Sequence, residues 1–154
     1  TEWGNLAIRC LCLQFRIRIE RFIMLKGSCC CGEVKFTVAS PPTMMGTCHC
    51  SRCRKIGIST FVFVKRDAFT LLSGADSITT FKPQAPYKYS RCFCSHCGCA
   101  LGEVTSNSES FPVAANCFDD ELPLNNQFHE FVQEKPNWYD ICDGAKQFRG
   151  HPHQ

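Results

Sequence analysis

The sequence predicts a mainly β domain of short antiparallel strands, and three observations support this. Short segments alternate apolar and polar residues, as a strand does when one of its faces is buried. Gly, Pro and Ser separate these segments, and no long stretch has the 3.6-residue period of an amphipathic helix. The chain has 154 residues, of which 44% are hydrophobic and 20% charged, which fits one globular domain and leaves little room for two.

The predicted strands follow one another from residue 33 onward. Segment 60–65 (TFVFVK) is the clearest, because its residues are β-branched or aromatic. The other expected strands are 33–39, 69–72, 78–81, 87–93, 100–104, 113–116 and 129–133. We expect one short helix, either around 119–122 or just after Cys53.

We expect residues 1–23 to be an N-terminal extension that is foreign to the domain of residues 24–154. They precede Met24 and carry no recognisable chemistry. The alternative is a real edge strand, because Phe15, Ile17 and Ile19 alternate with charged residues. Charges also interrupt the apolar residues here, so neither a secretory signal nor a membrane span is predicted, and a reducing cytoplasm is the expected location.

Cysteine dominates the composition, with fourteen in the chain. In a reducing compartment, clustered cysteines indicate metal binding more often than disulfides. Three clusters stand out, and they read Cys29-x-Cys31-Gly32, Cys48-x-Cys50-x₂-Cys53 and Cys94-x₂-Cys97-Gly98.

The spacing within these clusters suits zinc. Two thiolates on one tetrahedral zinc must lie within about 4 Å of each other, since Zn–S bonds are near 2.3 Å. A C-x₂-C turn followed by Gly achieves this, and so does a C-x-C pair on one face of a strand. The first and third clusters can therefore form one closed structural site from Cys29, Cys31, Cys94 and Cys97.

The middle cluster then provides three ligands, Cys48, Cys50 and Cys53. A zinc ion with three protein ligands keeps one coordination position open, which is typical of a catalytic site. Two zinc ions per chain with seven thiolates would shift the formal charge of +3 to about zero, which argues against a nucleic-acid partner.

Other interpretations stay open at this point. The clusters could form disulfides, or both zinc ions could be structural, with an eighth ligand from Cys30, Cys92, Cys99 or a histidine. We expect the spare cysteines to be small buried residues; these are Cys30, Cys92, Cys99, Cys117 and Cys142. His49 and His96 are expected to point outward or to hydrogen-bond behind the ligands rather than to bind metal.

The motifs resemble the glutathione-dependent formaldehyde-activating enzyme family, which also includes centromere protein V. The matching stretches are Gly27-Ser28-Cys29-x-Cys31-Gly32-x-Val34, Cys48-His49-Cys50-Ser51-x-Cys53-Arg54-Lys55, Phe93-Cys94-x₂-Cys97-Gly98 and the tail Pro136-Asn137-Trp138-Tyr139-Asp140-Ile141. The resemblance covers residues 24–151 and implies a small zinc-stabilised β-tent. It also implies a structural zinc on the first and third clusters and a catalytic zinc on the second.

The resemblance implies a zinc-dependent carbon–sulfur lyase that acts on a small thiol–aldehyde adduct such as S-(hydroxymethyl)glutathione. The thiol would occupy the open position, lose its proton and attack an aldehyde carbon, and the reverse step would release the aldehyde. Arg52, Arg54 and Lys55 either steer an acidic peptide such as glutathione or form ordinary solvated surface. The sequence shows no evident general base.

Two other functions fit the same residues. One is a non-catalytic, zinc-stabilised protein-binding module. The other is a thiol-redox protein that uses Cys92 and Cys99. For the lyase, the expected partner is a small thiol substrate, with no role for a membrane.

Overall fold

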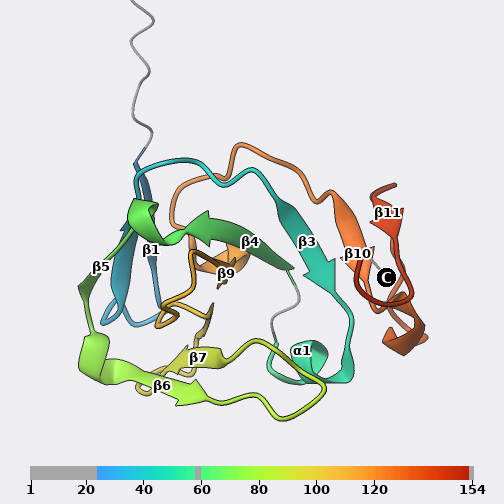
Figure 1. Ribbon diagram of the computed structural model, residues 1–154, viewed down its shortest axis with the longest axis horizontal. Coiled ribbons are helices and arrows are strands. Elements are labelled where there is room, and N and C mark those ends of the chain that lie inside the picture. Colours follow the sequence, from blue (N-terminus) through green and yellow to red (C-terminus); the bar gives the residue numbers. More distant parts are fainter. Residues whose placement is uncertain (1–23, 58–59, 153–154) are drawn as a thin grey trace, which may run out of the picture.

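The computed structural model describes residues 24–57 and 60–152 and shows a domain made largely of short strands (Figure 1). The strands are β1 (Leu25–Ser28), β2 (Lys35–Val38), β3 (Met45–Cys48), β4 (Thr60–Lys65), β5 (Phe69–Ser73), β6 (Ile78–Phe81), β7 (Arg91–Cys94), β8 (Ala100–Gly102), β9 (Ser110–Ala114), β10 (Phe128–Glu130) and β11 (Lys146–Gln147). The helical elements are α1 (Ser51–Lys55) and the 3-10 turns Arg66–Ala68, Ala75–Ser77, Ala115–Cys117 and Val132–Glu134. The predicted mainly β class is confirmed.

The strands form two sheets. The smaller has the order β1-β2-β5, and the larger has the order β11-β10-β3-β4-β9-β8-β7-β6. Neighbouring strands are antiparallel except around β10, which runs parallel to both β3 and β11. Figure 1 shows the small sheet at one side of the molecule and β10 and β11 at the other. The small sheet carries the β1–β2 turn, and the large sheet carries the β7–β8 turn.

The core contains the inward faces of both sheets. β4 alternates in burial, with Val62 and Val64 fully buried, and these residues pair with Val113 and Phe111 of β9. The ring of Phe36 on β2 stacks on that of Phe69 and meets the ring of Phe118 edge to face. The apolar alternation of β4 therefore turns one of its faces into the core and leaves Phe61 and Phe63 on the opposite face.

That opposite face continues across β3 and β10. Phe61 and Phe128 are both partners of Gly46 in the sheet register, and their rings lie 6.2 Å apart above it. A Cβ atom on Gly46 would lie 2.3 Å from the Phe128 ring. Glycine is therefore required at this position for the ring to lie over β3. Because side chains alternate along a strand, Cys48 points to the same face as residue 46.

Most of the predicted strands are confirmed, and several boundaries are wrong. The prediction for 60–65 matches β4, and 78–81 matches β6. The predicted strand 87–93 was too long, because only Arg91–Cys94 is regular. The predicted strands 113–116 and 129–133 both run into 3-10 turns.

The sequence analysis missed β1, β3 and the two-residue β11, which are short and lack clear alternation. The helix forms at Ser51–Lys55 and contains Cys53, while 119–122 is not helical. The predicted N-terminal extension and its alternative edge strand lie outside the described residues. Within the described ranges, no helix is long and apolar enough to cross a bilayer.

Candidate metal centres

The first candidate centre joins the two sheets. Cys29 and Cys31 lie in the β1–β2 turn, Cys94 ends β7 and Cys97 lies in the β7–β8 turn, and the four Sγ atoms lie within 4.8 Å of one another. Cys31 Sγ is 3.5 Å from that of Cys29 and 3.7 Å from that of Cys94. Tetrahedral zinc with Zn–S bonds near 2.3 Å requires about 3.8 Å between sulfurs, so this donor set fits zinc.

Backbone geometry explains why both pairs form. Gly32 and Gly98 each follow a cysteine pair and adopt positive φ angles of 77° and 71°. In each turn the glycine N–H bonds back to a cysteine carbonyl, at 2.9 Å to Cys29 and 2.8 Å to Cys94. A side chain at these positions would strain the turn, so the sequence C-x-C-G and C-x₂-C-G specifies the geometry that clusters the sulfurs.

Backbone donors also prepare this cluster for negative charge. The N–H groups of Cys99 and Cys31 lower the pKa of Cys97 to about 6. Burial alone would raise the pKa of Cys29, but hydrogen bonds, the first from the N–H of Val34 at 3.3 Å, lower it overall. Four thiolates this close repel one another unless a cation lies between them, and a dication suits that position.

The second candidate centre lies where β3 meets α1. Its residues are Cys48 at the end of β3, Cys50 at the N-cap of α1 and Cys53 inside α1, and all three are buried. Their Sγ atoms lie within 4.8 Å of one another, and no fourth His, Cys, Asp or Glu among the described residues joins the group. The structure thus brings together all seven predicted ligands, as one group of four and one of three.

The three thiols of the second centre interact strongly. Hydrogen bonds from Cys48 and Cys53 lower the pKa of Cys50 to about 2. The same interactions raise the pKa of Cys48 far above its usual range. One thiolate therefore forms readily among three buried thiols, and the other two need a cation before they ionise.

Two arginines supply positive charge at this centre. Nη2 of Arg91 donates to Cys53 Sγ at 2.6 Å, and Arg91 Nε is buried without a partner. The guanidinium of Arg52 lies 4.3 Å from the centre of the Tyr87 ring, and its Nε and Nη1 are also buried and unpartnered. Burial lowers the pKa of Arg52, as does the neighbouring charge of Arg91. Two guanidinium groups beside three thiols favour anionic sulfur.

A hydrogen-bonded chain begins at His49, the residue between Cys48 and Cys50. His49 Nε2 lies 2.8 Å from His129 Nδ1, and His129 Nε2 lies 3.0 Å from the carboxylate of Asp143. Asn126 bonds to both His129 and Asp143. Burial lowers the pKa of His49, followed by the effect of His129. His49 is buried and its ring bonds to His129, with no hydrogen bond to a cysteine ligand among the described residues. His96 is exposed, which agrees with the expectation that it points outward.

An apolar pocket of about 700 Å³ lies beside the second centre. Phe61 lines this pocket and also packs against the three cysteines. Phe131 packs against the cysteines as well but does not line the pocket. Glu130 faces Cys48 in the register of β10 and β3, is buried, lines the pocket and bonds to His151 at 3.0 Å. The pocket therefore lies on the sheet face that carries Cys48, and Phe61 separates its lining from the cysteines.

Sequence reasoning missed several residues of this site. Arg91, His129 and Glu130 lie far from the middle cluster in sequence, and no spacing motif connects them to it. The one feature of the sequence that could have indicated Arg91 is its position just before the third cysteine cluster. Arg54 and Lys55, which were considered as steering charges, are exposed.

The spare cysteines divide into two groups. Cys92 and Cys117 are buried as predicted, and Cys99 is half-buried with its Sγ 3.6 Å from that of Cys117. The prediction was wrong for Cys30 and Cys142, which are exposed because they lie in turns outside the strands. All twelve cysteines in the described ranges are free thiols, so the disulfide interpretation is not supported there.

The chain is similar to known proteins in sequence and in fold. Residues 24–134 match the family described as glutathione-dependent formaldehyde-activating enzyme. A protein of Halomonas elongata, provisionally named a glutathione-dependent formaldehyde-activating enzyme, is 33% identical over 141 residues, covering 84% of this chain and 90% of that protein. A crystal structure of a Rhodobacter sphaeroides protein is similar in fold, with a TM-score of 0.50 and 23% identity, and the match covers 64% of this chain and 91% of that chain.

Proposed function

The chain belongs to the glutathione-dependent formaldehyde-activating enzyme family, and from this premise we propose that it is a zinc-dependent carbon–sulfur lyase. The substrate is a small thiol–aldehyde adduct such as S-(hydroxymethyl)glutathione. The observation that carries the proposal is the group of three buried thiols, Cys48, Cys50 and Cys53, beside a pocket. Three donors leave a tetrahedral ion one position for a substrate sulfur.

The two groups of cysteines have different roles in this proposal. Cys29, Cys31, Cys94 and Cys97 hold a structural zinc, and Cys48, Cys50 and Cys53 hold the catalytic one. When bound at the second centre, zinc supplies Lewis acidity that favours the thiolate form of the substrate sulfur. Thiolate ligands must stay reduced, so we place the protein in the cytoplasm.

The arginines at the second centre offset the charge of the ligands. Three thiolates and one dication carry a net charge of −1 (−3 and +2), and an incoming thiolate adds another negative charge. Arg91 contacts Cys53 Sγ directly, and Arg52 lies against Tyr87 beside the cluster. In a partly buried site these guanidinium groups lower the free-energy cost of binding the substrate thiolate next to a centre that is already negative.

Glu130 is the side chain placed to handle the substrate proton. In the cleavage direction the adduct loses its hydroxyl proton as the carbonyl forms and the C–S bond breaks. The Glu130 carboxylate is buried beside Cys48, lines the pocket and is held by His151. It can accept a hydrogen bond from the hydroxyl and then its proton, which ends on the released thiol.

Turnover of a thiol–aldehyde mixture tests the proposal. The metal-loaded protein should interconvert glutathione plus formaldehyde and the adduct faster than the spontaneous reaction, measured by magnetisation exchange in NMR. Removal of the metal should abolish the excess rate. A rate equal to the spontaneous one at full metal occupancy would contradict the lyase and favour a protein-binding module.

Replacing Glu130 with glutamine should lower kcat about 10²-fold, because the amide cannot accept the hydroxyl proton. Metal content should stay the same, since Glu130 lies outside both cysteine groups. The matched control is Glu103→Gln. Glu103 accepts a hydrogen bond from the N–H of Ser90 and does not line the pocket. Equal activity of the two variants would remove Glu130 from the mechanism.

Replacing Arg91 with leucine should weaken metal binding at the second centre about 10- to 100-fold, because the variant loses the donor to Cys53 Sγ. Competition with a chromophoric chelator measures this loss. The control is Arg54→Leu on the same helix as Cys53, where the side chain is exposed. An unchanged affinity in the Arg91 variant would show that the contact does not support the ligand.

A further inference from the structure

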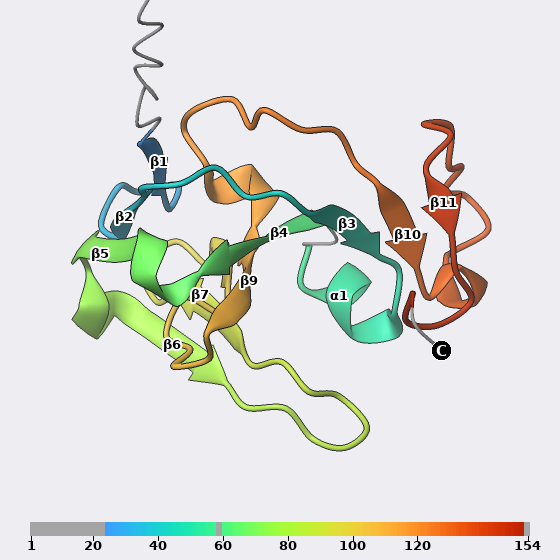
Figure 2. The same cartoon turned by 45° about the horizontal axis from the view of Figure 1, so that its top comes forward.

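Two pockets of different chemistry adjoin the second cysteine centre. The smaller, of about 280 Å³, is lined by polar and basic groups from α1, including Ser51, Arg52 and Lys55. The larger, of about 700 Å³, lies on the sheet face that carries Cys48. Figure 2 shows α1 between the end of β3 and the loop that joins β6 to β7. This loop lines both pockets, with Tyr87 in the smaller and Lys88 and Tyr89 in the larger.

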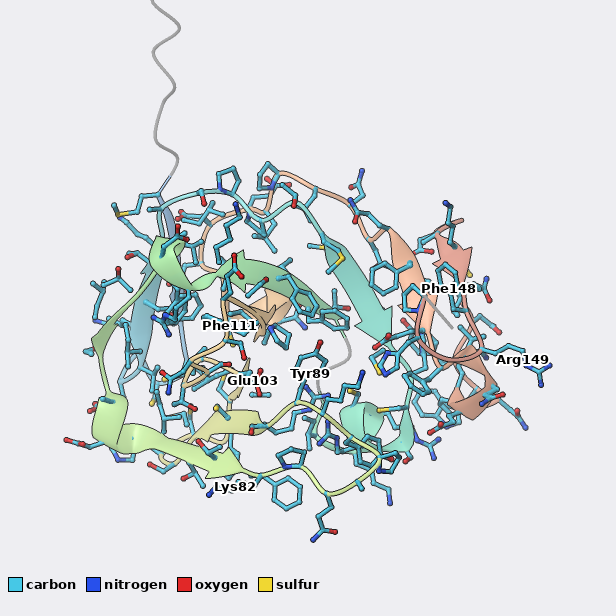
Figure 3. The ribbon with its side chains drawn as sticks, in the orientation of Figure 1. Lys82, Tyr89, Glu103, Phe111, Phe148 and Arg149 are labelled. Carbon is cyan, nitrogen blue, oxygen red and sulfur yellow. The ribbon has the colours of Figure 1, made fainter. Side chains whose placement is uncertain are left out.

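The larger pocket is predominantly aromatic. Its floor is the row formed by Phe61 and Phe128 over Gly46, and its further lining includes Phe63, Tyr89 and Phe148. Figure 3 labels Tyr89 and Phe148, which approach from elements on either side of β3. Aromatic rings arranged edge to face present an apolar surface that suits another ring.

The pocket has few polar groups, and only some of them already have a bonding partner within the protein. Glu130 is already bonded to His151. Lys88 and Lys146 line the pocket from exposed positions and make no ion pair among the described residues. A polar peptide such as glutathione would leave many of its groups unpartnered here, whereas an apolar body with an outer acidic group matches both the rings and the lysines.

We propose that the larger pocket takes the carbon group of an aldehyde bulkier than formaldehyde, namely an aromatic aldehyde that carries an acidic group. The inference rests on the proposed function, because it places the substrate sulfur at Cys48, Cys50 and Cys53. The polar thiol then extends into the smaller pocket, and the aldehyde-derived group extends along the sheet face over Gly46. Formaldehyde contributes one carbon and leaves the aromatic lining unused.

The reaction needs no additional reagent. In the adduct, one carbon carries the sulfur, a hydroxyl and the aromatic group. The C–S bond breaks with its electron pair left on sulfur, the hydroxyl oxygen forms the carbonyl, and the hydroxyl proton ends on the thiol. No atom changes its overall oxidation level, so the bulkier aldehyde undergoes the same step as formaldehyde.

Binding of three non-reacting thioethers to the metal-loaded protein tests the inference by calorimetry. S-benzylglutathione should bind at least about tenfold more tightly than S-methylglutathione, because its ring leaves water for the aromatic pocket. S-(4-carboxybenzyl)glutathione should bind about threefold more tightly again through the lysines. Equal affinities for the methyl and benzyl compounds would overturn the inference.

Substitutions in the larger pocket test whether the benzyl ring and its carboxylate bind there. Phe148→Ser should lower the ratio of the affinity for the benzyl compound to that for the methyl compound. The control Leu72→Ser removes an apolar side chain that is more exposed than Phe148 and lies on β5, outside both pockets. Lys146→Glu should abolish the gain from the carboxylate, and Lys65→Glu, outside both pockets, should keep it. A benzyl preference that survives Phe148→Ser would place the ring elsewhere and overturn the inference.

Turnover separates the failure of this inference from that of the lyase. The kcat/KM for 4-carboxybenzaldehyde with glutathione should exceed that for formaldehyde at least about tenfold. Enzymatic turnover of formaldehyde without a preference for the larger aldehyde would overturn the inference and leave the lyase intact. No enzymatic turnover of either aldehyde would contradict the lyase, and the inference would fall with it.

Discussion

Replacement of Cys94 by serine is expected to unfold the domain. Cys94 ends β7 in the large sheet, and its Sγ lies 3.7 Å from that of Cys31 in the β1–β2 turn of the small sheet. A metal ion at this centre therefore fastens the two sheets together across more than sixty residues of chain. Structural zinc contributes about 10–16 kcal/mol in small domains, which is comparable to the whole stability of most domains, about 5–15 kcal/mol.

Circular dichroism and thermal denaturation measure this effect. The Cys94 variant should show no cooperative unfolding transition, and a strong chelator should produce the same loss in the unmodified protein. The matched control is Cys92→Ser on the same strand. Cys92 is equally buried but contacts Thr80 and Thr105, whose hydroxyl groups a serine can also bond. If the Cys94 variant melted like the control, the first centre would not be the structural one.

Replacement of Cys50 by serine should leave the domain folded and abolish its activity. Cys48, Cys50 and Cys53 lie within six residues of chain, so a metal at this centre closes only a short loop and contributes little to the stability of the whole fold. Metal content should fall from about two to one per chain. Loss of Lewis acid catalysis worth about 4 kcal/mol corresponds to about a 10³-fold fall in kcat/KM.

Metal analysis by mass spectrometry, together with the turnover assay, checks this prediction. Cys99→Ser is the control, because Cys99 is half-buried but lies outside both cysteine groups. It should keep two metal ions and full activity. An unfolded Cys50 variant, or an unmodified protein with one metal ion, would make the second centre structural and favour a binding module.

The sequence was sufficient for the grouping of cysteines because the relevant constraints are local. A C-x-C or C-x₂-C pair followed by glycine determines a turn in which two sulfurs approach, whatever surrounds it, and Gly32 and Gly98 adopt the expected positive φ angles. Segment 60–65 likewise predicted β4, because its residues are β-branched or aromatic. The short β3 had no such signal, since all four of its residues are buried and it contains glycine.

The sequence by itself determined a mainly β, cysteine-rich domain with seven clustered thiol donors and its family. Only the tertiary structure decided which side chains surround the three-cysteine centre. Arg91 and Glu130 reach it from β7 and β10, through strand pairings between residues far apart in the chain, and His129 of β10 bonds to the neighbouring His49. Such pairings depend on how whole sheet faces are buried, which no local spacing encodes, and the aromatic pocket over Gly46 arises from the same long-range packing.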